Sequence, residues 1–493
     1  MGQFTKMINR LLDKGSKENA QAVLNELMKE AEKWRPPNYA AEMKRRRDYY
    51  EGKQGAWLRD ALARRYPSTY NEMSQIALNY ARLIADVDAC VYDHRPNREL
   101  WVGSDPVEDT PESREYQRIT IDAALNVTLA EGERRLMLMN TMFLHVRYNF
   151  NRGYPMVELF YPQDVWVIPD PDNPTSIEDS YAVIARTVNR GGLTTPDDSF
   201  VVYYREVRPG SEGKDYGPWL CEGIDSDGGR TEIFPENLVP YGVLPFIVWR
   251  NGIADGTIYR DADNDLLDTI DAINVNFTNI AYVLDMQAHS MLAYEGDSRE
   301  NIVGGPGKII SFAPGENLSV LDFDPKLKEM EMVNNNLIKT LASTRRQSPE
   351  AYSIEQKSPE SGVARQIQNM PYLKALKERQ YYAAQMESDL FPLFCRVSNA
   401  YTDGVTIDPD YYDMRWTAGD EPSFEEPIAK TTRILMALDS GLISRQRAAF
   451  EMGYYESEDE AARAMQLEVD ATTTAIEANA ISISERLQLA TGS

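Results

Sequence analysis

The sequence predicts an α+β fold, in which helical regions at both ends flank a central block of short strands. Three observations support this prediction: helical spacing of apolar residues over residues 1–140, β-branched and aromatic runs over residues 141–255, and helical spacing again beyond residue 261. The chain has 493 residues, of which 42% are hydrophobic. It is therefore long enough for roughly two to four domains that each bury a core.

The first region contains four expected helices and one short strand. Helical spacing covers residues 19–34, 40–54, 74–92 and 111–139, and a strand is expected at residues 99–102. The second helix carries the basic run Lys44-Arg45-Arg46-Arg47. Such a run is most often a solvated helix face, which is our interpretation, and contact with DNA or a partner is the alternative.

The central block is expected to form an antiparallel β module. Its expected strands are residues 142–150, 156–161, 165–168, 181–187, 200–207 and 244–249. Clusters of Gly, Pro, Asp and Asn separate these runs, as in residues 169–174, PDPDNP. These residue types favour turns, so the strands are expected to be joined by short connections.

A helix is expected from about residue 261 to 289, and it carries one narrow apolar stripe. Its members are spaced alternately by four and three residues: Leu266, Ile270, Ile273, Phe277, Ile280 and Leu284. A period near 3.5 is typical of helices that pack side by side along a seam. The opposite face carries Asp268, Asp271, Asn279 and Gln287, and we expect this face to contact water.

The segment that follows this helix is the most informative in the chain. In order, we expect a Gly- and Pro-rich break at 302–308, strands at 309–312 and 318–323, a helix at 327–346, a polar loop at 347–360 and a long helix at 361–400. Pro371 is expected to kink the long helix because it removes a backbone hydrogen bond. A compact domain seldom contains two helices that leave it, enclose a strand pair and return, whereas a ring of subunits around a channel does.

The charge and the cysteines limit the classes of function. A net charge of −25 argues against tight binding to DNA or to an anionic membrane. It is compatible with a channel through which DNA slides, because repulsion from acidic walls prevents sticking. No apolar run approaches the ~20 residues of a membrane span. The scattered Cys90, Cys221 and Cys395 predict a reducing compartment without disulfides.

The spacing of reactive residues predicts no catalytic, cofactor or metal site. The Gly-Lys pair at 307–308 is followed by isoleucine, where a phosphate-binding loop requires Ser or Thr. His94, His145 and His289 are far apart in the sequence and show no metal-ligand pattern. No Ser/His/Asp or Cys/His arrangement can be named from spacing.

Four segments carry a resemblance to a known family. They are residues 161–172, YPQDVWVIPDPD; 244–251, LPFIVWRN; 361–365, SGVAR; and 438–454, which begins LDSGLIS. In their order and spacing, over roughly residues 70–465, they resemble the portal proteins of tailed bacteriophages, which form head-to-tail connector rings.

The resemblance implies a portal fold with a helical stem, a small β clip, an α/β wing and a helical C-terminal crown. The implied parts are the wing (1–255), the first stem helix (256–290), the clip (291–325), the second stem helix (326–346), the tunnel loop (347–360), a long kinked wing helix (361–404), a returning wing strand (405–424), and inner wing and crown helices (425–493). The clip would turn at Gly304, Gly305, Pro306 and Gly307, which suits a tight bend.

The resemblance also implies a structural protein, with no enzymatic activity and no cofactor. Portal proteins form a homo-oligomeric ring at one capsid vertex, typically of about twelve subunits. Double-stranded DNA passes through the ring, without sequence-specific contacts, during genome packaging and ejection. The expected partners are the terminase large subunit, a head-completion adaptor, and tail, capsid and scaffolding proteins, with no membrane. The expected location is the virion, after assembly in the host cytoplasm.

The resemblance further implies roles for single residues. In the tunnel loop, contact with phosphates or sugars of DNA is expected for Ser348, Tyr352, Gln356 and Lys357. Arg345 and Arg346 are expected to face phosphate, or else to complement the helix C-terminus or pair with a neighbouring subunit. The inter-subunit seam of the stem would consist of Leu266, Ile270, Ile273, Phe277 and Ile280. Replacing Ile273 or Phe277 with Asp would then disturb the ring more than monomer folding.

Two other classes of protein remain open from the sequence. One is an acidic soluble hydrolase whose site is assembled from distant carboxylates, which sequence spacing does not reveal. The other is a different virion structural protein, such as an adaptor. The missing nucleotide motif and the helix pair favour the ring over the enzyme. The length of 493 residues favours it over most adaptors, which are smaller.

Overall fold

The computed structural model describes residues 17–189, 197–210, 213–225, 227–261, 264–288, 291–295, 317–321, 327–347, 362–419, 427–455 and 461–466. Helices and antiparallel sheets occur together, which confirms the α+β class. The chain divides into two compact units. The larger unit comprises residues 1–357 and 371–421, and the smaller comprises residues 358–370 and 422–493.

The first region of the larger unit is helical, as expected. Its helices are α2 (Lys17–Glu32), α3 (Tyr39–Tyr50), α4 (Gly55–Arg65), α5 (Tyr80–Asp88), α6 (Pro111–Asp122) and α7 (Leu125–Met139). Helix α5 begins later than predicted because Asn79 caps it, accepting a hydrogen bond from the N–H of Arg82 at 3.0 Å. The single helix expected over 111–139 is interrupted at Ala124, whose φ of 49° is left-handed.

The described strands of the central block form two larger antiparallel sheets and one two-stranded sheet. The six expected strands are present as β3 (Thr141–Asn149), β4 (Tyr154–Phe160), β5 (Val165–Ile168), β6 (Ala182–Asn189), β7 (Asp197–Tyr204) and β12 (Phe246–Arg250). The prediction missed β8 (Val207–Gly210), β9 (Gly213–Tyr216), β10 (Leu220–Asp225) and β11 (Arg230–Glu232). One sheet has the order β12-β3-β4, the other has the order β11-β10-β7-β6-β5, and β8 pairs with β9.

Alternation along the strands divides the buried residues between two cores. In β6, Val183 packs in the main core and Ile184 in a second core on the other face of the sheet. Helix α2 covers that second face with Val23, Leu24 and other apolar side chains. The period of two residues in a strand thus lets one sheet join the N-terminal helix to the main core.

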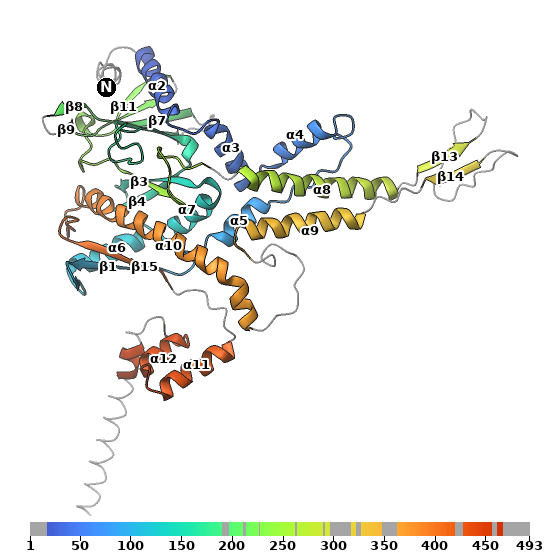
Figure 1. Ribbon diagram of the computed structural model, residues 1–493. Coiled ribbons are helices and arrows are strands. Elements are labelled where there is room, and N and C mark those ends of the chain that lie inside the picture. Colours follow the sequence, from blue (N-terminus) through green and yellow to red (C-terminus); the bar gives the residue numbers. More distant parts are fainter. Residues whose placement is uncertain are drawn as a thin grey trace, which may run out of the picture. The chain divides into compact units, whose positions relative to one another are not determined.

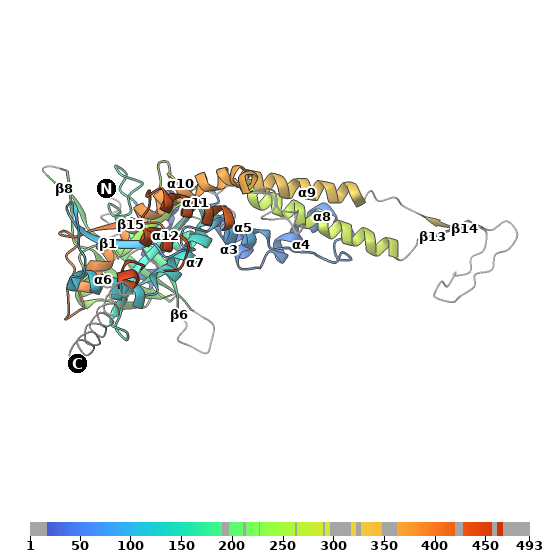
Figure 2. The ribbon, with the colours of Figure 1, turned by 90° about the horizontal axis from the view of Figure 1, so that it is seen from below.

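Helices α8 (Asn264–Ala288) and α9 (Leu327–Thr344) lie side by side and extend away from the sheets, as Figures 1 and 2 show. Both helices occur where the sequence predicts them. Between them, β13 (Met291–Glu295) pairs antiparallel with β14 (Asn317–Leu321). Strand β14 overlaps the strand predicted at 318–323, and β13 was not predicted. The strand predicted at 309–312 and the turn at Gly304, Gly305, Pro306 and Gly307 lie outside the described residues.

The long helix α10 (Gly362–Asn399) contains Pro371 and Pro392. The boundary between the two units falls between Met370 and Pro371. The predicted kink at Pro371 stays a prediction. Beyond α10, β15 (Asp413–Thr417) pairs antiparallel with β1 (Asn97–Val102), which in turn pairs with β2 (Asp105–Pro106). The C-terminal strand therefore returns to the N-terminal region of the larger unit.

The smaller unit contains helices α11 (Pro427–Asp439) and α12 (Arg445–Glu451) and a helical segment at 461–466. Ser444 caps α12 by accepting a hydrogen bond from the N–H of Arg447 at 3.0 Å. The three cysteines are free thiols: Cys221 and Cys395 are buried, and Cys90 is half-buried.

Candidate functional site at the α8–α9 helix pair

A polar contact joins the two long helices. Asn276 on α8 donates from Nδ2 to Oδ1 of Asn334 on α9 at 3.0 Å, and Asn334 is buried. Near the C-terminal end of α9, Ile338 and Leu341 are buried in the main core. Because the amide of Asn334 is buried, this contact tolerates few alternative alignments and fixes how the two helices are positioned along each other.

The predicted inter-subunit seam is wrong for the first part of α8. Leu266, Ile270 and Ile273 are buried in the main core of the same chain. Their side chains therefore have no surface left for a neighbouring subunit. Phe277 and Ile280, which come later in the stripe, are half-buried, and for them the seam stays a prediction. The stripe correctly predicts that this face packs against apolar residues, but a period of 3.5 does not tell which chain supplies them.

The opposite face of α8 contacts water only in part: Asp268 is exposed, as predicted, whereas Asp271 and Asn279 are half-buried. Arg45 donates from Nη2 to Asp268 at 2.9 Å and to Asp271 at 2.8 Å. The hydroxyl of Tyr49 donates to Asp271 as well. Two acidic residues of α8 are thus paired with one arginine of α3, although Asp268 remains largely exposed.

The basic run on α3 is not simply a solvated face. Arg46 is buried and donates to the carbonyl oxygen of Leu138 at 2.7 Å and to Glu42 at 2.9 Å. Lys44 is exposed, as the interpretation of this run requires. Adjacent members of the run therefore have different roles: Arg45 contacts α8, and Arg46 contacts the end of α7.

A third set of contacts surrounds α8 from the side of α4. Asn274 is buried and exchanges two hydrogen bonds with the backbone of Leu78, at 3.0 and 3.1 Å. Val275 packs with Leu58 and Leu62 of α4 in a small separate core. The first half of α8 is thus fixed on several sides by its own chain.

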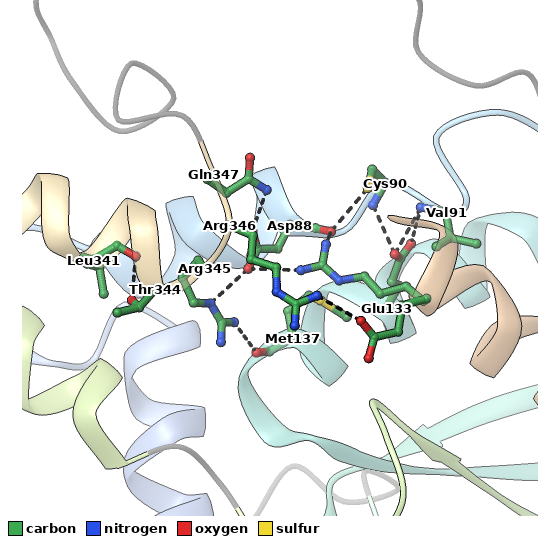
Figure 3. Close-up of polar contacts among 12 residues, drawn as sticks. Asp88, Cys90, Val91, Glu133, Met137, Leu341, Thr344, Arg345, Arg346 and Gln347 are labelled. Carbon is green, nitrogen blue, oxygen red and sulfur yellow. Dashed lines mark hydrogen bonds and ion pairs between the residues drawn. The ribbon is translucent and has the colours of Figure 1, made fainter. Parts of the chain in front are cut away.

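The C-terminal end of α9 is held by a buried carboxylate, Asp88 at the end of α5 (Figure 3). Arg345 donates from Nε to Asp88 at 3.1 Å and from Nη2 to the carbonyl oxygen of Met137 at 3.0 Å. Gln347 donates to the other carboxylate oxygen at 2.8 Å. Arg379 of α10 contributes a second guanidinium 3.7 Å from Asp88. One carboxylate therefore connects α5, α9 and α10.

A second buried carboxylate, Glu133 of α7, lies beside this cluster in Figure 3. It accepts hydrogen bonds from the backbone N–H groups of Cys90, Val91 and Tyr92, at 3.1 to 3.3 Å. Burial raises the pKa of Glu133 to about 7, although these bonds and the charge of Arg379 oppose the increase. The Glu133 carboxylate thus holds the chain that follows α5 and is able to gain a proton near neutral pH.

The two arginines at the end of α9 differ in what they contact. Arg345 contacts Asp88 and Met137 of its own chain, and its expected contact with phosphate or a neighbouring subunit stays a prediction. Arg346 forms an exposed pair with Glu378 at 2.9 Å. Its backbone is left-handed, with φ of 60°. The described residues of this region stop at Gln347 and resume at residue 362. They therefore do not include the predicted tunnel-loop residues Ser348, Tyr352, Gln356 and Lys357.

A third buried carboxylate, Glu387, ties α10 to the strand β1. Arg98 donates to it from Nε at 2.8 Å and from Nη2 at 2.5 Å, and the hydroxyl of Tyr92 donates at 3.0 Å. Sequence reasoning missed all three carboxylates, although a signal was present. Each stands four residues after a buried apolar side chain on the same helix, namely Ile84, Leu129 and Ala383.

The described part of the chain contains no cluster of three or more His, Cys, Asp or Glu residues arranged to hold a metal ion. Among the described helices, none combines the length and the apolar character needed to cross a membrane.

Comparisons with solved structures find distant similarities, two of which follow. No family model matches the sequence, and no curated protein matches it. One similar solved chain belongs to the neck of an empty GTA particle computed with C6 symmetry, with a TM-score of 0.38 and 9% identity. Another belongs to the virion of a native gene transfer agent (GTA) particle, with a TM-score of 0.38 and 10% identity. Each alignment covers 85% of this chain and 94% of the other chain, and both scores are too low to show a shared fold.

Proposed function

We propose that this chain is the subunit of a portal ring in a tailed-bacteriophage-like particle, through which double-stranded DNA is packaged and later ejected. The observation that carries the proposal is the exposed apolar surface of the α8–α9 pair. Leu284 on α8 is 48% exposed, and Met332 and Val333 on α9 are 56% and 48% exposed. Apolar side chains on a projecting helix pair mark a surface that another protein covers.

A second copy of the chain is the partner that best fits this surface. The half of α8 nearest the sheets is held by Arg45, Asn274 and the main core. The farther half is less buried: Phe277 and Ile280 are half-buried, and Leu284 is exposed. In a ring, the far half of each pair packs against the pairs on either side, and closed symmetry covers every copy of the surface.

The β13–β14 ribbon supports the same arrangement. A two-stranded sheet alone is marginally stable in water, and its edges are free to pair with other strands. Residues of the proposed clip, 291–325, pair with neighbouring ribbons in the ring, which stabilises the ribbon and removes the exposed edges. The clip is also the proposed contact for the head-completion adaptor.

DNA passes through the ring without tight binding. The proposed contacts are Ser348, Tyr352, Gln356 and Lys357 of the tunnel loop, which follows the anchored Gln347. The net charge of −25 keeps the contacts weak. The terminase large subunit, tail proteins, and capsid and scaffolding proteins are the remaining proposed partners, with the virion as the location.

Native mass spectrometry of the full 56.0 kDa chain, with negative-stain images, tests the ring directly. The wild type is expected to form a closed ring of about a dozen subunits. A variant with Met332→Asp and Val333→Asp is expected to keep its circular dichroism spectrum and to dissociate into monomers. Val127→Asp on α7, which is also exposed, is the matched control and should leave the ring intact.

Two results would contradict the proposal. Rings of unchanged mass from the α9 double variant would show that this surface is not the subunit contact. A wild-type chain that stays monomeric at every concentration would exclude a self-assembling ring.

A further inference from the structure

A cavity of about 310 Å³ lies at the base of α9, inside the larger unit. Its lining includes four arginines and one carboxylate: Arg260, Arg345, Arg346, Arg379 and Glu378. This excess of positive charge contrasts with a chain whose net charge is −25. The lining of the cavity is therefore positively charged, whereas the chain as a whole is negatively charged.

Two of the four guanidinium groups are committed to structure. Arg345 and Arg379 both contact Asp88, which is fully buried and is not part of the cavity lining. Arg345 also donates to the carbonyl oxygen of Met137, in the last turn of α7. These contacts offset the partial negative charge at the end of that helix. Arg345 and Arg379 thus hold Asp88 while adding positive charge to the lining of the cavity.

The other two guanidinium groups remain available. Arg346 pairs with Glu378, but both side chains are half exposed, so this pair is weak. Arg260 forms no ion pair with any described residue. Within the same ranges its only hydrogen bond comes from its backbone, whose N–H donates to Oγ1 of Thr141 at 3.0 Å. Arg260 is half-buried, and none of its guanidinium nitrogens is among the described buried atoms that lack a hydrogen-bond partner. Its N–H donors therefore reach the open space of the cavity, where a ligand can accept from them.

The side chain of Arg260 packs directly against the backbone of Gly252. Gly252, another lining residue, has a φ of 127°, which L side chains rarely adopt. A Cβ atom at this position would overlap the guanidinium group of Arg260. Glycine is thus required both for the backbone conformation and for the position of the arginine in the cavity.

We propose that this cavity binds a phosphate-class oxyanion, held by Arg260 and Arg346. The planar guanidinium fork matches two oxygens of a phosphate at once, which favours this ligand over chloride. The cavity volume is at the lower end of the range for ligand sites, which suits a small anion. The nearby side chain of Asn251 adds a neutral donor to the lining. All lining residues belong to one chain, so the proposed site does not require a ring.

Isothermal titration calorimetry with sodium phosphate, at constant ionic strength, measures the site on the full chain. The wild type is expected to bind phosphate, and Arg260→Gln is expected to weaken the affinity at least about tenfold, or ~1.4 kcal/mol. Gly252→Ala should give a similar loss with the charge retained, because it displaces the guanidinium. Arg64→Gln, an exposed arginine of α4, is the control and should bind like the wild type.

The proposal is overturned if Arg260→Gln binds phosphate as the wild type does, or if the wild type gives no binding heat. The ³¹P linewidth of inorganic phosphate then identifies the source of the ligand. If a short DNA duplex sharpens the line by displacing phosphate from the wild type, the natural ligand is a phosphodiester. If the line is unchanged, the site takes a free phosphate, and both results support the site.

Discussion

Two adjacent arginines at the end of α9 allow a matched test of buried and exposed ion pairs. Arg345 is 14% exposed and pairs with Asp88, which is fully buried. Arg346 is 51% exposed and pairs with Glu378, which is 54% exposed. Replacing either residue with Met removes one positive charge from the same helix end and keeps much of the side-chain length.

The expected costs differ because only Arg345→Met leaves a buried charge poorly compensated. Breaking a buried pair from one side costs about 3–5 kcal/mol. Here the lower end is expected, since Arg379 stays 3.7 Å from Asp88 and Gln347 still donates to it. Exposed pairs contribute about 0–1 kcal/mol, which sets the limit for Arg346→Met.

Hydrogen exchange of the backbone amides at residues 341–347 measures the difference. These amides include the N–H of Gln347, which donates to the carbonyl oxygen of Ala342 at 2.9 Å. A loss of ~3 kcal/mol corresponds to a decrease in protection of more than about a hundredfold, and a loss of ~1 kcal/mol to about fivefold. Equal decreases in the two variants, or a larger decrease for Arg346→Met, would refute the role given to Asp88.

Three further variants test other parts of the structure. Ile273→Asp should abolish folding, because the side chain of Ile273 lies in the main core. Leu284→Asp should leave a soluble chain with weakened rings, because Leu284 is 48% exposed. Soluble yield and native mass spectrometry distinguish the two outcomes. Folding raises the pKa of Glu133 from 4.5 to about 7, so the folded chain keeps this proton at pH values where the unfolded chain has lost it. The free energy of unfolding is therefore highest below pH 4.5 and decreases by about 1.4 kcal/mol per pH unit up to pH 7. The melting temperature of Glu133→Gln should therefore rise relative to the wild type between pH 5 and 7, and a constant difference would contradict this. Arg46→Met should cost ~1–3 kcal/mol in urea unfolding because it leaves a buried carbonyl unpaired, while Lys44→Met should be neutral.

Periodicity predicted the elements of this fold better than it predicted their ends. Six strands of the central block and the helices α8 and α9 follow from runs with periods of two and near 3.5, whereas β8 to β11 do not. The break between α6 and α7 did not follow, because Ala124 has a left-handed backbone without being Gly or Asn. Helix α5 was predicted too long because apolar spacing continues upstream of Asn79, where the hydrogen bonds go to α8 instead.

The candidate site was less predictable because its residues meet through tertiary contacts. Asp88, Arg345 and Arg379 are up to 291 positions apart, and no spacing in the sequence connects them. Composition also misled the interpretation of the basic run on α3, since burial of Arg46 depends on the carbonyl oxygen of Leu138. A carboxylate on an apolar helix face is a usable signal, because such a residue is rarely buried without a partner.

The contact between Arg98 and Glu387 has a mechanical consequence for α10. A helix that slides along its axis by one turn moves about 5.4 Å and replaces each residue by the one four positions away. After such a slip, Arg98 would meet Ala383 or Phe391, both of which are buried and apolar. The guanidinium of Arg98 would lose its ion pair with Glu387 in either direction, so this ion pair opposes sliding of α10 along its axis. A force applied to the N-terminal end of α10 would therefore be transmitted to β1, and to β15 and β2 that pair with it, before the helix slipped.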